Sequence, residues 1–207
     1  MWRGDKTNVT LPLKKEKIIQ KQYYNIMAFN CSLNRDLLRS NSCGYSLPEV
    51  KDIYLANYTD VTASTVSAST DTGCTGEEVT SISLASGAKF YHIEPAKNSV
   101  TFEDSLVVED SGNKYRTHSL TFNIAGQYDA CMHLDLDALS LGRYFAVVVT
   151  ADGKWLALGR LTGMEAETAT LQGGGDTNGI QIVLTANTTE SAVPLSSAAI
   201  ATVKGGE

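Results

Sequence analysis

The chain has 207 residues, of which 43% are hydrophobic and 19% charged, and its formal net charge is −6. That length can bury the core of one domain without disulfides or metal ions, so a single domain with flanking tails is the natural expectation. Residues 1–26 hold six basic and two acidic residues, a net charge of +4, and the remaining −10 on residues 27–207 argues against nucleic-acid binding by this acidic body.

The first 26 residues differ in composition from the rest. Two interpretations stay open: Met27 is the native start and residues 1–26 are a translated upstream region or an added extension, or they form a genuine basic arm that docks on a neighbour. The run Lys14-Lys15-Glu16-Lys17 interrupts any apolar stretch, so we expect neither an export signal nor a membrane span. We predict a basic extension at 1–26, one β-rich domain at 27–190 and a flexible C-terminal tail at 191–207.

Short runs of alternating polar and apolar residues, bounded by Gly, Asn, Asp and Ser, predict strands. The predicted strands cover residues 50–56, 79–84, 89–93, 100–109, 114–124, 143–150, 154–161, 164–171 and 179–186. Within 114–124 the alternation places one set of side chains on a buried face: His118, Leu120, Phe122 and Ile124. The Ser/Thr-rich stretch 59–78 is either a mobile loop or a weak pair of edge strands.

Residues 127–141 change to helical spacing and end at Gly142, which predicts one helix. Tight turns at 110–113 and 151–153 join neighbouring strands, and such hairpins imply antiparallel pairing. We therefore expect a mainly β fold of two packed antiparallel sheets, as a sandwich or half-open barrel, with one covering α-helix. The predicted core consists of Phe102, Leu120, Phe122, Ile124, Leu136, Leu139, Phe145, Val147, Val149, Leu156, Leu158, Ile180, Ile182 and Leu184.

Candidate metal ligands are few. His92 and His118 lie on separate predicted strands without an evident carboxylate or thiol partner, and His133 has Asp129 and Asp137 at helical spacing, as in solvated helix-face pairs. The four cysteines form no CxxC pair, which favours free thiols and leaves their disulfide state open: Cys31, Cys43, Cys74 and Cys131.

Candidate catalytic groups are equally sparse. Three pairs of neighbouring acids occur: Glu77-Glu78, Glu103-Asp104 and Glu109-Asp110. Neighbours on a strand point to opposite faces, so no pair alone supplies the two facing carboxylates of a glycosidase, and solvated strand ends are the better interpretation. The Gly173–Gly175 run precedes a strand rather than a helix, which argues against a phosphate loop. The sequence predicts no enzyme, no cofactor and no catalytic, cofactor-binding or metal-binding residues.

A pattern of elements between residues 101 and 194 carries a resemblance. It comprises the strand "YRTHSLTFNIAG", a short helix, an Asp152-Gly153 turn, a strand ending in Leu158-Gly159, and a terminal Glu190-to-Pro194 segment. This order resembles small structural proteins of phage and prophage tails that share the tail-tube-like fold. The resemblance implies a virion protein of a tailed phage, made in the bacterial host cytoplasm and assembling as homo-oligomeric rings. Its implied partners are itself, other virion tail proteins, and DNA as passing cargo, with no membrane.

The rival interpretation is a cell-surface or periplasmic β-sandwich binding module, for instance for glycans. Under the ring interpretation, an acidic inner surface lets DNA slide without sticking. We also expect the poorly patterned stretches, 59–78 above all, to carry oligomerisation, because they are too poor in large apolar residues to order by themselves.

Overall fold

The computed structural model describes residues 49–69, 76–124, 130–173 and 179–205. Every described residue belongs to one compact unit. The predicted extension at 1–26 and the cysteines Cys31, Cys43 and Cys74 lie outside the described residues.

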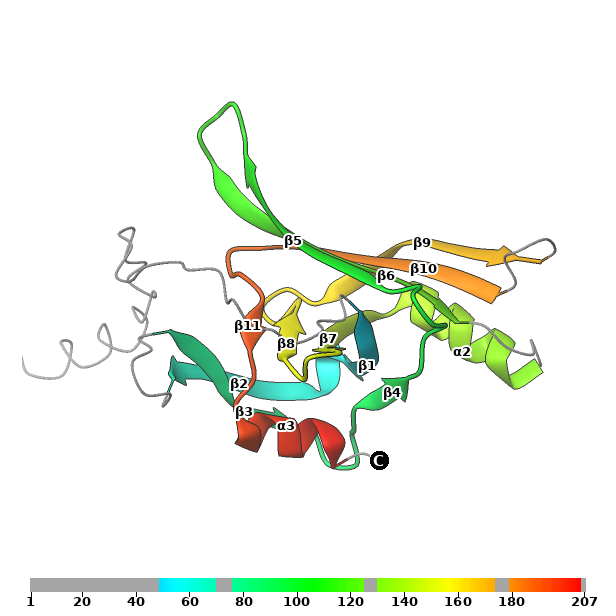
Figure 1. Cartoon of the computed structure of the whole chain (residues 1–207), viewed down its shortest axis with the longest axis horizontal. Helices are drawn as coiled ribbons and strands as arrows, with labels where there is room; N and C mark the ends of the chain where they lie inside the picture. The colour runs from blue at the N-terminus through cyan, green and yellow to red at the C-terminus, as the bar shows by residue number, and fades with distance from the viewer. Residues whose placement is uncertain (1–48, 70–75, 125–129, 174–178, 206–207) are drawn as a thin grey trace, which may run out of the picture. The chain divides into compact units, whose positions relative to one another are not determined.

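The described part is mainly β, as predicted, with antiparallel strands and two helices (Figure 1). The strands are β1 Val50–Asn57, β2 Val61–Ala68, β3 Glu77–Leu84, β4 Tyr91–Ile93, β5 Thr101–Val108, β6 Lys114–Ile124, β7 Arg143–Thr150, β8 Trp155–Leu158, β9 Met164–Gln172, β10 Gly179–Thr188 and β11 Val193–Pro194. The helices are α2 Ala130–Leu141 and α3 Ser197–Lys204, with a 3-10 turn η1 at Tyr58–Asp60.

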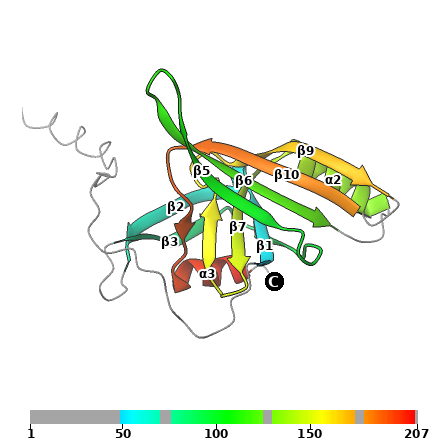
Figure 2. The same cartoon turned by 45° about the horizontal axis from the view of Figure 1, so that its top comes forward.

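Nine strands share one antiparallel sheet in the order β11-β8-β7-β9-β10-β6-β5, and β1 pairs with β7 and with β4. Only Arg143 with Glu165 and Tyr144 with Met164 join β7 to β9. The sheet bends at this narrow junction into two parts, which we call the upper leaf (β5-β6-β10-β9) and the lower leaf (β11-β8-β7-β1-β4) (Figures 1 and 2). The two leaves pack face to face without closing into a barrel.

The core between the leaves follows the period of two in the sequence. Leu120 and Phe122 of β6 are fully buried against Ile182 and Leu184 of β10, which confirms the predicted buried face of 114–124. The predicted core residues are buried except four that are partly buried and pack against the same cluster: Phe102, Ile124, Leu139 and Leu156.

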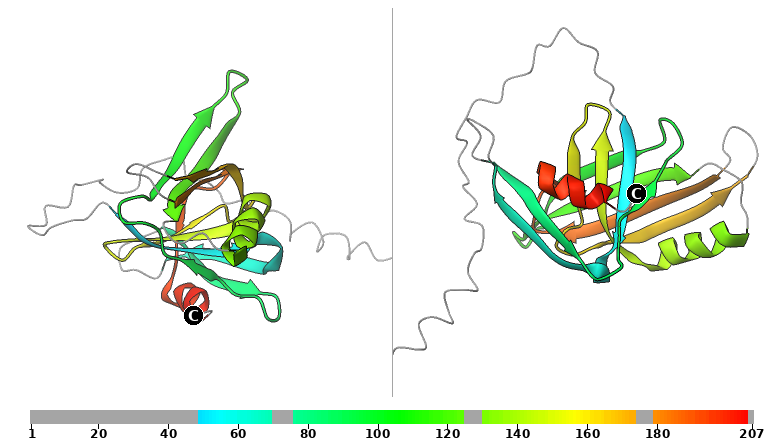
Figure 3. Two further views of the ribbon diagram at one scale, coloured as in Figure 1. Left: turned by 90° about the vertical axis from the view of Figure 1, so that its right-hand side faces the viewer. Right: turned by 90° about the horizontal axis from the view of Figure 1, so that it is seen from below.

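Strand β7 has the unbroken apolar run "YFAVVV", typical of a strand buried on both faces. Tyr144, Ala146 and Val148 face the core between the leaves. The alternate residues face a second cluster, to which β3 and α3 contribute: Phe145, Val147 and Val149. The fold therefore has a third layer, made of the β2–β3 pair and α3, on the side of the lower leaf that faces away from the upper leaf (Figure 3).

The C-terminal segment differs from the flexible tail predicted at 191–207. Val193 and Pro194 form β11 against β8, and the Ser196 hydroxyl caps α3 by accepting a hydrogen bond from the Ala199 N–H. Ala199 and Val203 are fully buried in the second cluster. The small side chains of this segment resemble those of a tail, but they permit close packing of a short helix. The described residues thus contain two helices where one was predicted.

The Ser/Thr-rich stretch 59–78 contains a strand. Val61–Ala68 pairs antiparallel with Glu77–Leu84, the strand predicted separately at 79–84, so the stretch 59–78 supplies one strand of a pair rather than both, and residues 70–75 lie outside the described part. Val61 and Val66 pack against the second cluster. Helix α2 begins at Ala130, and residues 127–129 of its predicted range also lie outside the described part.

Candidate assembly surface

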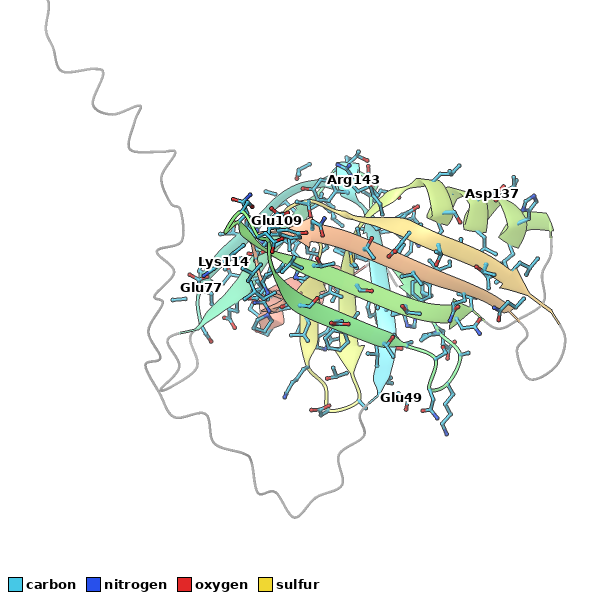
Figure 4. All side chains as sticks on the ribbon, turned by 90° about the horizontal axis from the view of Figure 1, so that it is seen from above. Glu49, Glu77, Glu109, Lys114, Asp137 and Arg143 are labelled. Atoms are coloured by element: carbon cyan, nitrogen blue, oxygen red, sulfur yellow. The ribbon has the colours of Figure 1, made fainter. Side chains whose placement is uncertain are left out.

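The outer face of the upper leaf is polar. Cross-strand pairing places these side chains on it: Thr101, Glu103, Ser105, Val107, Tyr115, Thr117, Ser119, Thr121, Asn123, Thr168, Thr170, Gln181, Val183, Thr185 and Asn187. Figure 4 looks onto this face from above. The four strands carry two basic residues, Lys114 and Arg116, and both are in register with the core-side residues Val108 and Leu106. The outer face of these strands therefore offers hydroxyls, amides and carboxylates but no cation.

Charge at the margin of this face is balanced. Arg143 at the start of β7 forms an ion pair with Glu165 of β9, through an Nε–Oε1 hydrogen bond of 2.6 Å. The pair is more than half exposed on both sides, so its contribution to stability is small.

The β5 edge of the upper leaf is open, whereas helix α2 lies beside the outer side of β9 (Figure 4). Within the described residues, β5 pairs with β6 alone, and β9 beyond Glu165 pairs with β10 alone. Natural sheets usually protect long edges with charges, bulges or a covering element, because unpaired backbone groups invite another strand. Here β5 has eight residues, and the hairpin that it forms with β6 projects from the leaf (Figure 1).

Large apolar side chains are exposed along these edges. Leu106 and Val108 of β5 are 58% and 56% exposed, and Leu171 of β9 is 59% exposed. All three lie on the core side of the leaf, because Leu106 pairs with Arg116 on the face of Leu120, and Leu171 pairs with Ile180. The apolar face of the leaf therefore continues past the covered core at both ends.

A charged cluster lies at the base of the projecting hairpin. Arg116 Nε donates a 2.6 Å hydrogen bond to Asp104 Oδ1, and the Ala192 N–H donates to Asp104 Oδ2 at 2.9 Å. His118, 1% exposed, accepts a hydrogen bond at Nδ1 from the Gly159 N–H, and its Nε2 lies 3.5 Å from Asp104 Oδ1. The cluster ties the hairpin to the loops that lead into β9 and β11.

The titration of this cluster follows from its surroundings. Burial lowers the pKa of His118 and outweighs the Asp104 carboxylate, which raises it. Burial alone would raise the pKa of Asp104, but the hydrogen bonds from Arg116 and Ala192 and the nearby His118 outweigh it, and the pKa is lowered. At neutral pH the imidazole is therefore neutral and the carboxylate ionised.

A more deeply buried ion pair links all three layers. Arg160, which follows β8, donates two hydrogen bonds to the Glu190 carboxylate, at 2.7 Å from Nε to Oε2 and 2.5 Å from Nη2 to Oε1. Its Nη1 donates to the carbonyl and hydroxyl oxygens of Ser64 in β2. The Arg160 and Glu190 side chains are 9% and 5% exposed. This contact fixes the segment of the Glu190-to-Pro194 motif against the lower leaf.

Comparison with known proteins found no relative of this chain. No protein family, no curated protein and no solved structure matches the chain. Within the described residues, no helix is long and apolar enough to cross a membrane. The interpretation of the surface therefore depends on its own geometry.

The other histidines take separate positions. His92 Nε2 lies 3.0 Å from Asp52 Oδ1, and its ring stacks on Tyr54 at 4.8 Å between centroids. His133 lies 3.8 Å from Asp137 on the exposed face of α2, as predicted, whereas Asp129 is outside the described residues. Among the residues described, no three His, Cys, Asp or Glu side chains gather as metal ligands.

The predicted interpretation of the acidic pairs needs one correction. Glu103 points to the outer face, but Asp104 is ion-paired and faces His118, so it is not a solvated strand end. Glu77 is exposed at the start of β3, and Glu109 accepts hydrogen bonds from Ser111 and Asn113 in the hairpin turn. Gly173 follows β9, while Gly174 and Gly175 lie outside the described part.

Proposed function

We propose that this chain is a structural protein of a tailed-phage or prophage virion that assembles with copies of itself into rings of the tail-tube kind. The observation that carries the proposal is the upper leaf, whose β5 edge has no strand partner among the described residues and whose strands present a polar outer face without Lys or Arg. An enzyme or small-ligand protein has no need of either feature.

When one patch of a subunit binds a second, different patch of the next, the contact is repeated head to tail and closes into a ring if the rotation permits. A sheet that joins edge to edge in this way becomes a wall, and one of its faces becomes the lining of the ring.

The polar face suits a lining along which DNA passes. Proteins hold DNA mainly through Lys and Arg contacts to phosphates, and each such contact adds affinity. The outer face of the four strands has none, and its carboxylate Glu103 repels phosphates. DNA would therefore slide along this wall without being retained. The other virion tail proteins would contact the rims of the ring.

Electron microscopy and sedimentation velocity of the purified full chain test the proposal. The expected result is a concentration-dependent shift from monomer to ring-shaped particles with a central opening. A chain that remains monomeric at every concentration up to the solubility limit would overturn the proposal and favour the β-sandwich binding module.

A further inference from the structure

We propose that a groove between β4 and α2 binds an extended segment of a different protein, which pairs with the free edge of β4 and carries both apolar and basic side chains. The inference goes beyond the proposed function and does not depend on ring formation. Three features of the groove support it: its apolar walls, the backbone groups of β4 and its charge.

The first feature is the groove itself, bordered by β4 and α2 (Figure 1). Its volume is about 590 Å³, and Leu55 and Tyr144 of the lower leaf also line it. Tyr91 is 52% exposed there. Four further lining residues pack against the core between the leaves but are only partly buried: Ile93, Ile124, Met132 and Leu139. The core is therefore incompletely covered at the groove, and an apolar side chain that enters it is removed from water.

The second feature is the direction of the backbone groups of β4. The Thr150 N–H donates to the Lys154 carbonyl, so even-numbered residues of β7 bond to β8 and odd-numbered residues bond to β1. The register of β1 with β7 and β4 then makes Tyr91 and Ile93 bond to β1. His92 turns its N–H and C=O to the opposite edge, which has no strand partner among the described residues.

A strand that pairs with this edge lies inside the groove, because every residue from Tyr91 to Glu94 lines it. Segments that bind by strand addition gain affinity from main-chain hydrogen bonds and specificity from pockets for alternate side chains. Ile93 faces the same core cluster as Leu136 and Leu139 of α2. The partner therefore needs an apolar residue at every second position, on the face that meets these side chains.

The third feature is charge. The charged residues that line the groove are Glu94 and Asp135, and both are exposed, while Lys89 lies over the ring of Tyr91 without lining the groove. Complementary charge favours a partner with Lys or Arg between its apolar residues.

A second copy of the described part cannot supply such a segment. Its strands with a free edge include β2, β5 and β11, and none of these holds a Lys or Arg. The partner is therefore a different protein.

Binding of a fluorescent heptapeptide to the full chain tests the charge and the walls. The probe is Lys-Val-Lys-Val-Lys-Val-Lys with blocked ends, and we expect it to bind roughly tenfold tighter than the same peptide with Glu in place of Lys. Asp135→Lys and Glu94→Lys should each weaken binding of the basic probe about fivefold, measured by fluorescence anisotropy. Asp137→Lys is the matched control, because Asp137 is exposed on the same helix and does not line the groove.

A pair of substitutions at His92 tests the backbone contact. His92→Pro removes the N–H that faces the free edge, where proline is tolerated in a strand, and should weaken binding about fivefold. His92→Ala keeps this N–H but loses the same side-chain contacts with Asp52 and Tyr54, and should bind the probe like the parent. Circular dichroism of each variant checks that the fold is retained.

Each contrary outcome is distinct. Equal binding of the basic and acidic probes, or of the parent and Asp135→Lys, overturns the inference, and so does an equal loss in Asp137→Lys. If His92→Pro binds like His92→Ala, strand addition is overturned. If Asp135→Lys impairs self-assembly without any peptide, the groove is a contact between copies and the inference is wrong. A parent chain that forms no ring contradicts the proposed function alone, because probe binding is measured in either case.

Discussion

The backbone N–H of Gly159 donates a 3.0 Å hydrogen bond to Nδ1 of His118. Nδ1 must therefore be unprotonated, so the single proton of the neutral ring is on Nε2, toward Asp104 Oδ1 at 3.5 Å. A second proton on the ring would remove the acceptor that Gly159 uses. The contact makes the folded state sensitive to protonation of one buried side chain.

Stability should fall in mild acid because of His118. Its folded-state pKa is below the ordinary 6.5, so the unfolded chain takes up the proton at higher pH than the folded chain does. The stabilisation is complete above about pH 6.5 and is lost as the pH falls below that value toward the folded-state pKa. Urea midpoints between pH 7.5 and about 5 measure the effect.

His118→Gln serves as the control for this pH dependence, since its side chain cannot titrate. We expect a less stable variant whose urea midpoint changes little between about pH 6.5 and 5. Asp104 acts in a separate pH range. Because its pKa is lowered from the ordinary 3.8, it stabilises the folded state above about pH 3.8, and this stabilisation is lost only as the pH falls below that value. A slope near pH 6 that is equal in both proteins would contradict the assignment to His118.

Removing one partner of the Arg160–Glu190 pair should be costly. Arg160→Met leaves the Glu190 carboxylate buried without its partner, and we expect a loss of about 3–5 kcal/mol in the free energy of unfolding. Arg143→Met removes the exposed pair with Glu165 and should cost under about 1 kcal/mol. Denaturant unfolding of both variants checks the contrast, and equal losses would show that burial of the pair is not decisive.

Phe122 should contribute strongly to the core between the leaves. It is fully buried, and Phe122→Ala leaves a cavity that should cost about 3–5 kcal/mol. Leu106→Ala removes an exposed side chain and should cost under about 1 kcal/mol in the monomer. A loss under about 1 kcal/mol for Phe122→Ala in denaturant unfolding would contradict the face assigned to β6.

Helix α3 should be part of the folded domain. Val203 is fully buried and Ala201 on the same helix is exposed. Val203→Asp should therefore destabilise the chain by more than about 3 kcal/mol, while Ala201→Asp should change it by about 0.5 kcal/mol or less. Thermal unfolding of the two variants decides: equal melting temperatures would be expected of a flexible tail.

Regular alternation made most of the fold predictable from the sequence. The β6 run places His118, Leu120 and Phe122 on one face by period alone, and the structure buries all three. Helix α3 was not predicted because Ser, Ala and Thr give little apolar contrast, and its burial depends on how closely it fits the second cluster.

Part of the charged cluster could be predicted from the sequence. The hairpin turn predicted at 110–113 fixes the register of its strands, and that register places Asp104 opposite His118. The Arg160 contacts with Glu190 and Ser64 could not be predicted in this way, because they join residues up to 96 positions apart through the packing of three layers. The open edge of β5 likewise becomes visible only once the strand order is known.

Strand β1 has an unusual position in the order of synthesis. The ribosome makes residues 50–57 long before the longer of their two partner strands, 143–150, whereas the hairpins β5–β6 and β7–β8 are made from adjacent stretches. An apolar strand that waits this long for its partner is open to wrong pairing with other nascent chains. Slow translation or a shortage of chaperones should therefore lower the yield of folded protein by trapping chains in which β1 has emerged and β7 has not.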